Sequence, residues 1–171
     1  QLEQSFGINF TVLVNGQPKV LNLKEILQEF LKHRKDVVVK RTKYELRKAK
    51  DRGHIVEGLM VAIANIDEVI KIIKKSKDPK VASQELIKKK WKAGPVEAIL
   101  KKVGKDACKP KGAPKGIGLS GKSYKLSNDQ AKAILELRLG RLTGLEQDNL
   151  SNEFNSLIEK IISLQEIIDD K

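Results

Sequence analysis

Three glycines of this 171-residue chain have the spacing of a nucleotide-binding motif. Gly116, Gly118 and Gly121 spell G-x-G-x-x-G, with which a Rossmann fold holds a dinucleotide pyrophosphate at the start of a helix. That motif needs a buried strand before it and a helix that opens within it. Here it follows the polar stretch KPKGAPK and precedes Lys122-Ser123-Tyr124. We therefore predict a loop that binds no nucleotide.

The other reactive side chains are too few and too scattered for catalysis. His33 and His54 are the only histidines, and on one helix they would lie roughly 30 Å apart, so they cannot share a metal ion. Tyr44 lies in a basic helix pattern, where we expect it along the helix surface. Cys108 is the only cysteine, which excludes a disulfide framework or a cysteine metal site. The sequence predicts no catalytic centre and no metal in this chain.

Positive charge is the strongest compositional signal. The formal net charge is +12, and Lys32–Arg52 alone holds ten Lys or Arg against three acids. Two interpretations stay open: a solvated helix face, or an electrostatic surface for nucleic acid, where phosphates need only cations. No wide apolar face accompanies the charge, which does not favour a membrane-surface helix. The residues predicted to face DNA are Arg34, Lys35, Lys40, Arg41, Lys43, Arg47 and Lys48.

The N-terminal elements that carry this charge can be predicted from local signals. Phe10–Val14 is a strand-like run that ends at Asn15-Gly16, a favoured pair for a type I′ turn, so a hairpin is expected over residues 10–23. A helix follows from about Leu23 to at least Arg52. Gly53 and Gly58 are the first expected breakers, and they are also candidate points of compliance.

The middle of the chain predicts several short helices. Residues 55–73 are apolar with helical period in two pieces, and Pro79 and Pro95 each open a helix, ending near residues 90 and 103. Residues 104–123 are rich in Gly, Pro and Lys, which indicates a mobile loop. Ser127 and Gln130 form a capping box before a helix that should end near Thr143-Gly144.

The last segment has a heptad seam that needs a partner helix. The simplest partner is the long N-terminal helix, packed antiparallel through Leu27, Leu31, Val38, Leu46 and Ala49. A self-dimerising C-terminal coiled coil is the competing fold. The apolar residues of the seam are Leu150, Phe154, Leu157, Ile161, Leu164 and Ile168.

The predicted fold is mainly α: a long antiparallel two-helix coiled coil that carries a small helical globule, with a short N-terminal β-hairpin. The predicted domains are 1–22 (hairpin), 23–53 with 146–171 (coiled-coil arm) and 54–145 (globule, with the mobile loop 104–123). No run is long enough to span a bilayer, and the lone cysteine favours a reducing, cytoplasmic location. Glutamine in place of methionine at position 1 suggests a fragment of a longer chain.

Uncommon strings along nearly the whole chain resemble one protein family. HRKDVV, RTKYELRKA, HIVEGL, ANIDEVI and LRLGRLTGLE are similar to the A subunit of bacterial DNA gyrase, with the related A-type subunit of topoisomerase IV as the alternative. Agreement is poorest at residues 104–123. In this family the matching region is a coiled-coil arm whose tip joins two subunits at the exit gate, and the hairpin ends the preceding tower domain.

The resemblance implies a non-catalytic part of an ATP-dependent enzyme that passes one DNA duplex through another. The family's DNA-cleaving tyrosine follows an arginine in a different domain, whereas Tyr44 follows Lys43. ATP and Mg²⁺ would be bound by the gyrase B-type partner subunit, and no cofactor by this chain. Double-stranded DNA would make transient, non-specific contacts. The implied homodimer patch on the globule is Ile55, Leu59, Met60, Ile63, Ile66, Ile134, Leu135, Leu137 and Leu139.

A different class of function stays open at this point: a freestanding basic coiled-coil adaptor that binds nucleic acid or a partner helix. Such an adaptor needs no gate and could be monomeric. The oligomeric state of the chain in solution therefore separates the two hypotheses better than any motif does.

Overall fold

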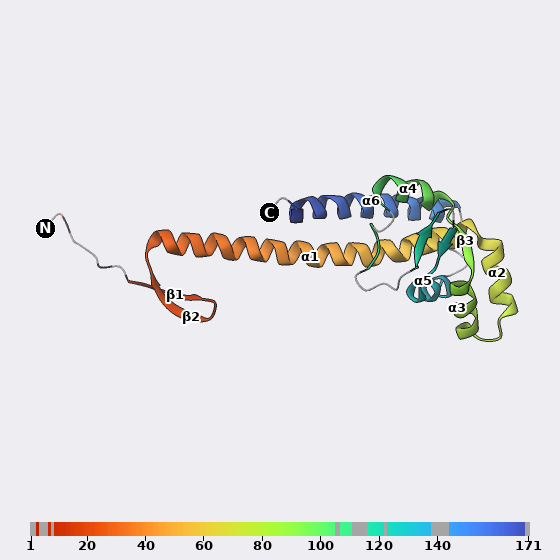
Figure 1. Cartoon of the computed structure of the whole chain (residues 1–171), viewed down its shortest axis with the longest axis horizontal. Helices are drawn as coiled ribbons and strands as arrows, with labels where there is room; N and C mark the ends of the chain where they lie inside the picture. Colours follow the sequence, from red (N-terminus) through yellow and green to blue (C-terminus); the bar gives the residue numbers. More distant parts are fainter. Residues whose placement is uncertain are drawn as a thin grey trace. The chain divides into compact units, whose positions relative to one another are not determined.

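The structure is a computed structural model of the chain, and it divides into two compact units, residues 1–43 and 44–171 (Figure 1). Each unit is described by itself. No helix in the described part is long and apolar enough to cross a membrane. The residues that the structure describes are 3, 7, 9–104, 107–110, 116–121, 123–137 and 144–169.

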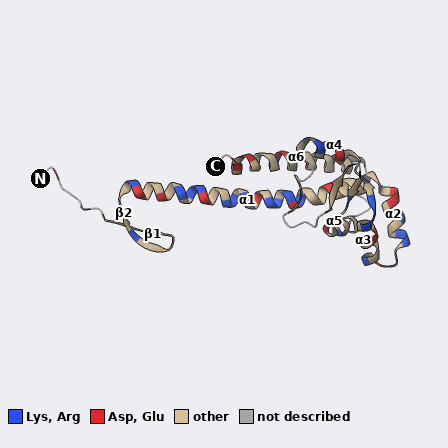
Figure 2. Cartoon of the chain, in the orientation of Figure 1, with Lys and Arg blue, Asp and Glu red and all other residues tan. Residues whose placement is uncertain are grey.

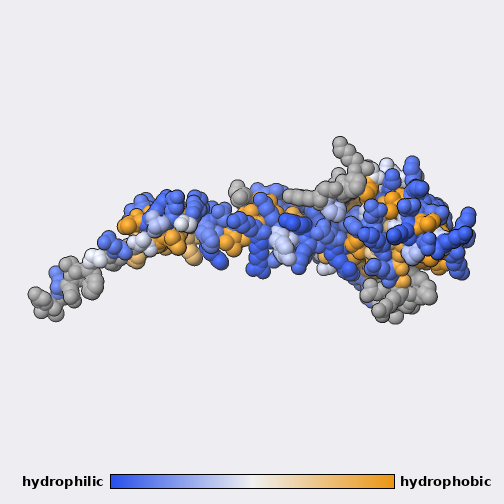
Figure 3. Space-filling model, turned by 90° about the horizontal axis from the view of Figure 1, so that it is seen from below, coloured by the Kyte–Doolittle hydropathy of each residue, from blue (hydrophilic) through white to orange (hydrophobic). Residues whose placement is uncertain are grey.

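The first unit confirms the predicted hairpin. Strands β1 (Phe10–Val14) and β2 (Gln17–Leu21) pair antiparallel. Asn15 and Gly16 link them with φ of 53° and 79°, as a type I′ turn requires at both central positions. Many apolar side chains of this unit are exposed, and some are seen in orange in Figure 3. They include Phe10, Leu13, Val20, Leu23, Leu27, Phe30, Leu31, Val37 and Val38.

Helix α1 (Leu23–Ala64, 42 residues) begins in this unit with a reciprocal cap. The Asn22 side chain accepts from the Glu25 backbone N–H, and the Glu25 carboxylate accepts from the Asn22 N–H, both at 2.9 Å. These two bonds satisfy donors that the first turn of a helix otherwise leaves free.

The expectation that Gly53 and Gly58 interrupt this helix is wrong, because both lie inside α1. A Cβ built on Gly58 would lie 2.5 Å from Gln130 Cγ, and one on Gly53 would lie 3.1 Å from Cys108 Sγ. These glycines therefore let neighbouring elements approach the helix backbone closely. Packing against the helix outweighs the weak helix propensity of glycine at both positions.

In the second unit, α6 (Gly144–Asp169) packs antiparallel to α1 (Figure 1). Ile63 lies beside Leu150, whereas Ala49 lies beside Leu157 further back along α1. The predicted seam of α6 is confirmed: four of its six residues are buried, Leu157 and Ile168 are half-buried, and Ile158 is buried as well.

The predicted face of α1 is only partly buried. Leu46 is half-buried and Ala49 is buried, but Leu27, Leu31 and Val38 are exposed. This part of the coiled-coil prediction is wrong for the described structure. Helix α6 has 26 residues against 42 in α1, so it is too short to cover the whole of α1.

The described residues in the rest of the second unit form a globule of four short helices and a small sheet. The helices are α2 (Ile66–Lys75), α3 (Pro79–Lys88), α4 (Pro95–Val103) and α5 (Asn128–Leu135). The strands are β3 (Lys90–Lys92), β4 (Gly118–Ser120) and β5 (Ser123–Lys125), in the antiparallel order β3-β5-β4.

The small sheet lies within the predicted helical globule, and its strand β4 falls in the predicted mobile loop 104–123, which is therefore ordered at residues 118–120. Residues 105–106, 111–115 and 122 of that loop lie outside the described residues. Trp91, Leu119 and Tyr124 are buried side chains of the three strands, so the sheet belongs to the core. Cys108 is also buried against α1. No helix opens within the G-x-G-x-x-G motif, because Gly118–Ser120 forms β4.

The predicted capping box at the start of α5 is confirmed. Ser127 Oγ accepts from the Gln130 backbone N–H at 3.2 Å, and Gln130 Oε1 accepts from the Ser127 N–H at 2.9 Å. The helix ends at Leu135, earlier than expected. Residues 138–143, where its end was predicted, lie outside the described residues.

Candidate functional surfaces

The seven basic residues predicted to face DNA are all exposed on α1. Arg34 and Arg41, seven residues apart in the first unit, share one stripe of α1, whereas Arg47 and Lys48 belong to the second unit. The Lys48 ammonium lies 5.1 Å from the ring centre of Tyr44, which is 54% exposed. This cation–π contact lies on the surface of α1, which agrees with the expectation that Tyr44 lies along the helix surface. Figure 2 shows positive charge spread along the helix.

The apolar residues predicted to form the dimer patch have two different environments. Leu59, Met60 and Ile134 are core residues of the globule, with 3–6% of their surface exposed. A docking patch cannot use side chains that the chain already buries. Five others are half-buried, and Leu139 lies outside the described residues. The half-buried members are Ile55, Ile63, Ile66, Leu135 and Leu137.

Three of the half-buried residues line two separate grooves beside α1, whereas Ile66 and Leu135 line neither groove. Ile55 and Leu137 line the groove between α1 and α5, with Leu59 at its floor. Ile63 lines another groove, formed with α4 and α6. We call the first one the α1–α5 groove. Its rim carries two basic and two acidic residues: Arg52, Lys132, Asp129 and Glu136.

A buried hydrogen-bond network holds α5 against α1, and only its capping box could be predicted from sequence. His54 Nε2 lies 2.8 Å from Ser127 Oγ. Gln130 Nε2 donates to the His54 carbonyl oxygen at 2.7 Å and to the Tyr124 hydroxyl at 2.8 Å. His54 and Glu57 stand three residues apart on one face of α1, which is the spacing that could have suggested a joint role.

The network requires a neutral His54. Its Nδ1 lies 3.3 Å from the Gln130 Nε2 donor, so Nδ1 accepts and the proton sits on Nε2, facing Ser127. A second ring proton would point at another donor. Burial lowers the pKa of His54, and the charges of Asp129 and Asp51 oppose that shift without reversing it.

Glu57 is the acidic member of the network and is 4% exposed. Burial raises its pKa to about 7, against smaller lowering effects of its hydrogen bond with the Tyr124 hydroxyl and of the Lys109 charge. Burial also raises the pKa of the Cys108 thiol to about 12, with Glu57 adding to the shift. That thiol is therefore protonated and unreactive at neutral pH.

The network is built for structure rather than for a reaction. No buried side-chain N or O atom in the described part of the chain lacks a hydrogen-bond partner. Within the same residues, no group of three or more His, Cys, Asp or Glu side chains is placed to hold a metal ion. A fully satisfied network of this kind rigidifies the elements it joins.

Comparison with known proteins identifies the family. The family model for the A subunit of DNA gyrase/topoisomerase IV matches residues 1–171. The DNA gyrase A subunit of Pseudomonas aeruginosa is 49% identical over 168 residues, which is 98% of this chain and 18% of that protein. The Escherichia coli protein of the same name is 47% identical over 154 residues, or 90% of this chain and 18% of that protein.

A more distant relative gives the same result. The DNA gyrase A subunit of Staphylococcus aureus is 42% identical over 170 residues, covering 99% of this chain and 15% of that protein. The chain thus spans less than a fifth of the length of these relatives. The matches agree with the resemblance of HRKDVV, HIVEGL and LRLGRLTGLE: the chain belongs to the family of DNA gyrase and topoisomerase IV A subunits.

Proposed function

We propose that this chain forms the exit gate of a bacterial DNA gyrase, where two copies meet through the globule and part to release a transported DNA duplex. The observation that carries the proposal is the α1–α5 groove. It presents the half-buried side chains of Ile55 and Leu137 between α1 and α5. Apolar side chains in a groove with a charged rim are typical of protein interfaces.

The charges around the groove suit a contact between identical surfaces. A two-fold interface brings the same patch against itself, so each basic residue needs an acidic one in the same patch. The rim supplies both signs, with Lys132 and Arg52 against Asp129 and Glu136, although Arg52 already pairs with Glu153 at 2.7 Å within the chain. Because exposed ion pairs contribute little, such a rim orients the partners without locking them together. A gate that opens in every cycle needs a contact that aligns the two copies but still lets them separate.

The rest of the catalytic cycle would belong to other parts of the enzyme. In this proposal the chain has no catalytic residue, since its two tyrosines follow Lys43 and Ser123 rather than an arginine. ATP and Mg²⁺ would act on the B-type partner subunit. The chain's own residues would hold the dimer, and the basic residues of α1 would face the passing duplex.

The gate hypothesis predicts a dimer in solution that depends on the α1–α5 groove. Light scattering across a dilution series should give a mass about twice the 19.2 kDa of one chain, persisting to low micromolar concentration. The double change Ile55→Glu and Leu137→Glu should weaken dimerisation by about thirtyfold or more, because it places charge at the apolar centre of the contact.

Two variants complete the dimerisation test. Ile162→Glu combined with Ile167→Glu introduces the same two charges at exposed sites on α6 and should leave the mass unchanged. Lys132→Glu alters only the exposed rim and should weaken the dimer less than the double change does. Fluorescence of Trp91, which is buried in the globule, reports whether each variant is folded. A folded wild-type chain that stays monomeric would favour the adaptor hypothesis instead.

The basic residues of α1 should bind duplex DNA independently of the gate. Replacing Lys40, Lys43, Arg47 and Lys48 with glutamine should weaken binding to a short duplex and flatten its salt dependence, since each lost phosphate contact removes released counterions. Fluorescence anisotropy at several salt concentrations measures both quantities. The light-scattering mass should not change. Equal affinity at low salt would remove the electrostatic role of α1.

A further inference from the structure

A second basic surface lies on the globule, in a segment where the sequence predicted only helices. Nine lysines and four acidic residues occur between Ile66 and Lys92, and all nine lysines are exposed. Figure 2 shows basic residues in blue around α2 and α3. We call the nine lysines the tip lysines: Lys71, Lys74, Lys75, Lys77, Lys80, Lys88, Lys89, Lys90 and Lys92.

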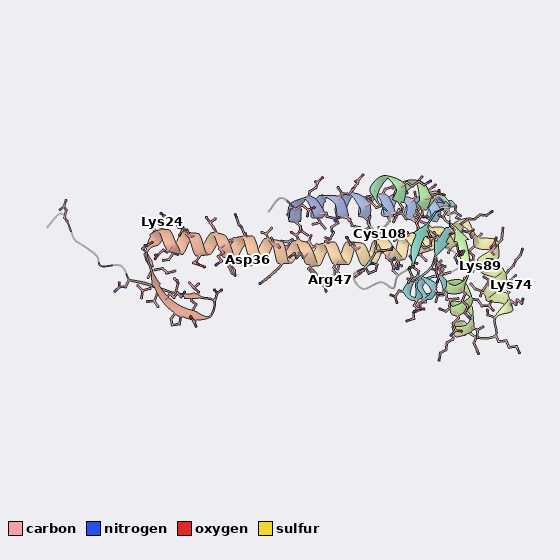
Figure 4. The ribbon with its side chains drawn as sticks, viewed as in Figure 1. Lys24, Asp36, Arg47, Lys74, Lys89 and Cys108 are labelled. Carbon is pink, nitrogen blue, oxygen red and sulfur yellow. The ribbon has the colours of Figure 1, made fainter. Side chains whose placement is uncertain are left out.

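The packing of the globule turns these lysines outward. Helix α2 buries Val69, and α3 buries Ala82 and Leu86, so the lysines of both helices lie on the opposite, solvent-facing sides. In β3 the side chain of Trp91 is buried, which places its two lysine neighbours on the other face of the strand. Figure 4 shows Lys74 and Lys89 at this end of the globule.

Stability of the helices explains only part of this charge. Lys74, Lys75 and Lys88 lie in the last turns of their helices, where a cation interacts favourably with the helix dipole. Lys89 Nζ lies 5.1 Å from the ring centre of Trp91 and also stabilises the globule. The remaining tip lysines lie outside these last turns. Lys90 stands directly opposite Lys125 in the β3–β5 ladder, and like charges at that position are destabilising. At Lys90, therefore, the surface carries a positive charge that strand pairing disfavours.

The neighbouring acids do not neutralise the patch. Within the described residues, the salt bridge formed by a tip lysine joins Lys89 Nζ to Glu68 Oε2 at 2.6 Å. The pKa of Glu68 is lowered, chiefly by its hydrogen bond with Lys89 and by that lysine's charge, with further lowering from Lys92 and Lys71. Several cations thus act on one carboxylate, and an excess of positive charge remains for a partner.

We propose that the tip lysines bind the phosphate backbone of duplex DNA without reading its sequence. Lysine offers a compact point charge, which suits backbone phosphates but lacks the planar fork of arginine that reads guanine edges. Trp91 is the one aromatic residue of the segment and is 2% exposed, so no ring is available to stack unpaired bases. A double-stranded polyanion is the ligand that fits.

This surface extends the proposed function, which assigned DNA contact to α1 and the dimer contact to the α1–α5 groove. The tip lysines lie on α2, α3, β3 and the segments that join them, so their binding to DNA requires neither α1 nor the α1–α5 groove. Two copies joined at the groove would carry two such patches. The dimer mass and the α1 variant therefore test the proposed gate, whereas a variant of the tip lysines tests only whether those lysines bind DNA.

The test uses the full chain and a short fluorescent duplex, with anisotropy measured over a salt series. The tip variant replaces Lys74, Lys75 and Lys80 with glutamine. It should bind about tenfold more weakly or worse at low salt, with a salt slope reduced by about two to three, near 0.9 for each lost contact. A control variant removes the same charge from exposed Lys19, Lys101 and Lys160, which lie outside α1 and the tip, and should stay within about twofold of wild type.

Three results would overturn the inference. The tip variant could bind like the control variant, or wild-type binding could show no salt dependence. Polyglutamate could also bind more tightly than the duplex at the same ionic strength, which would assign the patch to an acidic protein partner. Trp91 fluorescence shows that the variants remain folded, because this side chain lies between Lys90 and Lys92 in the sheet.

Discussion

Replacing Gly58 with alanine will destabilise the globular unit by about 2–4 kcal/mol, the cost of overpacking plus disturbed buried hydrogen bonds. The new Cβ would lie 2.5 Å from Cγ and 2.8 Å from Cβ and Cδ of Gln130. Gln130 is fully buried and bonded to Ser127, His54 and Tyr124, so it cannot move aside without breaking that network. The usual gain of about 1 kcal/mol for Gly→Ala within a helix does not offset this loss.

Gly53→Ala is the matched control on the same helix. Its added Cβ would meet Cys108 Sγ at 3.1 Å, a contact that a shift of a few tenths of an ångström relieves. The helix-propensity gain should leave this variant close to wild type in stability. Urea unfolding followed by Trp91 fluorescence compares the two variants in the same unit. Equal stability of both would show that α5 does not depend on the close approach at Gly58.

Local signals were enough to predict the elements whose stability is local. The hairpin follows from Asn15-Gly16, whose positive φ values match the twist of two strands. The seam of α6 follows from the regular spacing of Phe154 and Ile161, because that period leaves one apolar stripe to bury. The capping box of α5 was equally readable at Ser127, since its hydrogen bonds join residues three apart.

The sheet and the close helix contacts could not be predicted in the same way. Strands of three residues are too short to show a two-residue period, and β3 pairs with β5 across thirty residues of intervening chain. Glycine has a low helix propensity, yet Gly58 lies inside α1 because Gln130 packs closely against it. Periodicity also marks a residue as buried without saying what buries it. Leu59 and Ile55 were therefore indistinguishable until the core and the groove were seen.

A proton on Glu57 should make the globule more stable at mildly acidic pH than at neutral pH. The folded-state pKa is about 7, and the ordinary value is 4.5. The folded chain thus holds the proton more tightly than the unfolded chain. The contribution of this group is fully present below pH 4.5 and is lost as pH rises to about 7. That loss amounts to about 3 kcal/mol, because each pKa unit corresponds to about 1.4 kcal/mol.

Glu57→Gln removes this dependence, because an amide stays neutral at every pH and its oxygen can still accept from the Tyr124 hydroxyl. The variant should match wild type near pH 4.5 and exceed it by about 3 kcal/mol near pH 8. Urea unfolding at several pH values, followed by Trp91 fluorescence, measures the difference. His54 acts in the opposite sense in both proteins: its pKa is lowered, so its contribution is lost as pH falls below 6.5.

Glu68→Gln provides the surface control. Its carboxylate is exposed and held ionised by Lys89, which lowers its pKa, so this variant should gain no stability at high pH. A wild-type curve parallel to that of Glu57→Gln would mean that Glu57 stays ionised in the folded globule. The network would then hold α5 with a buried charge, and Lys109 would have to be the group that stabilises it.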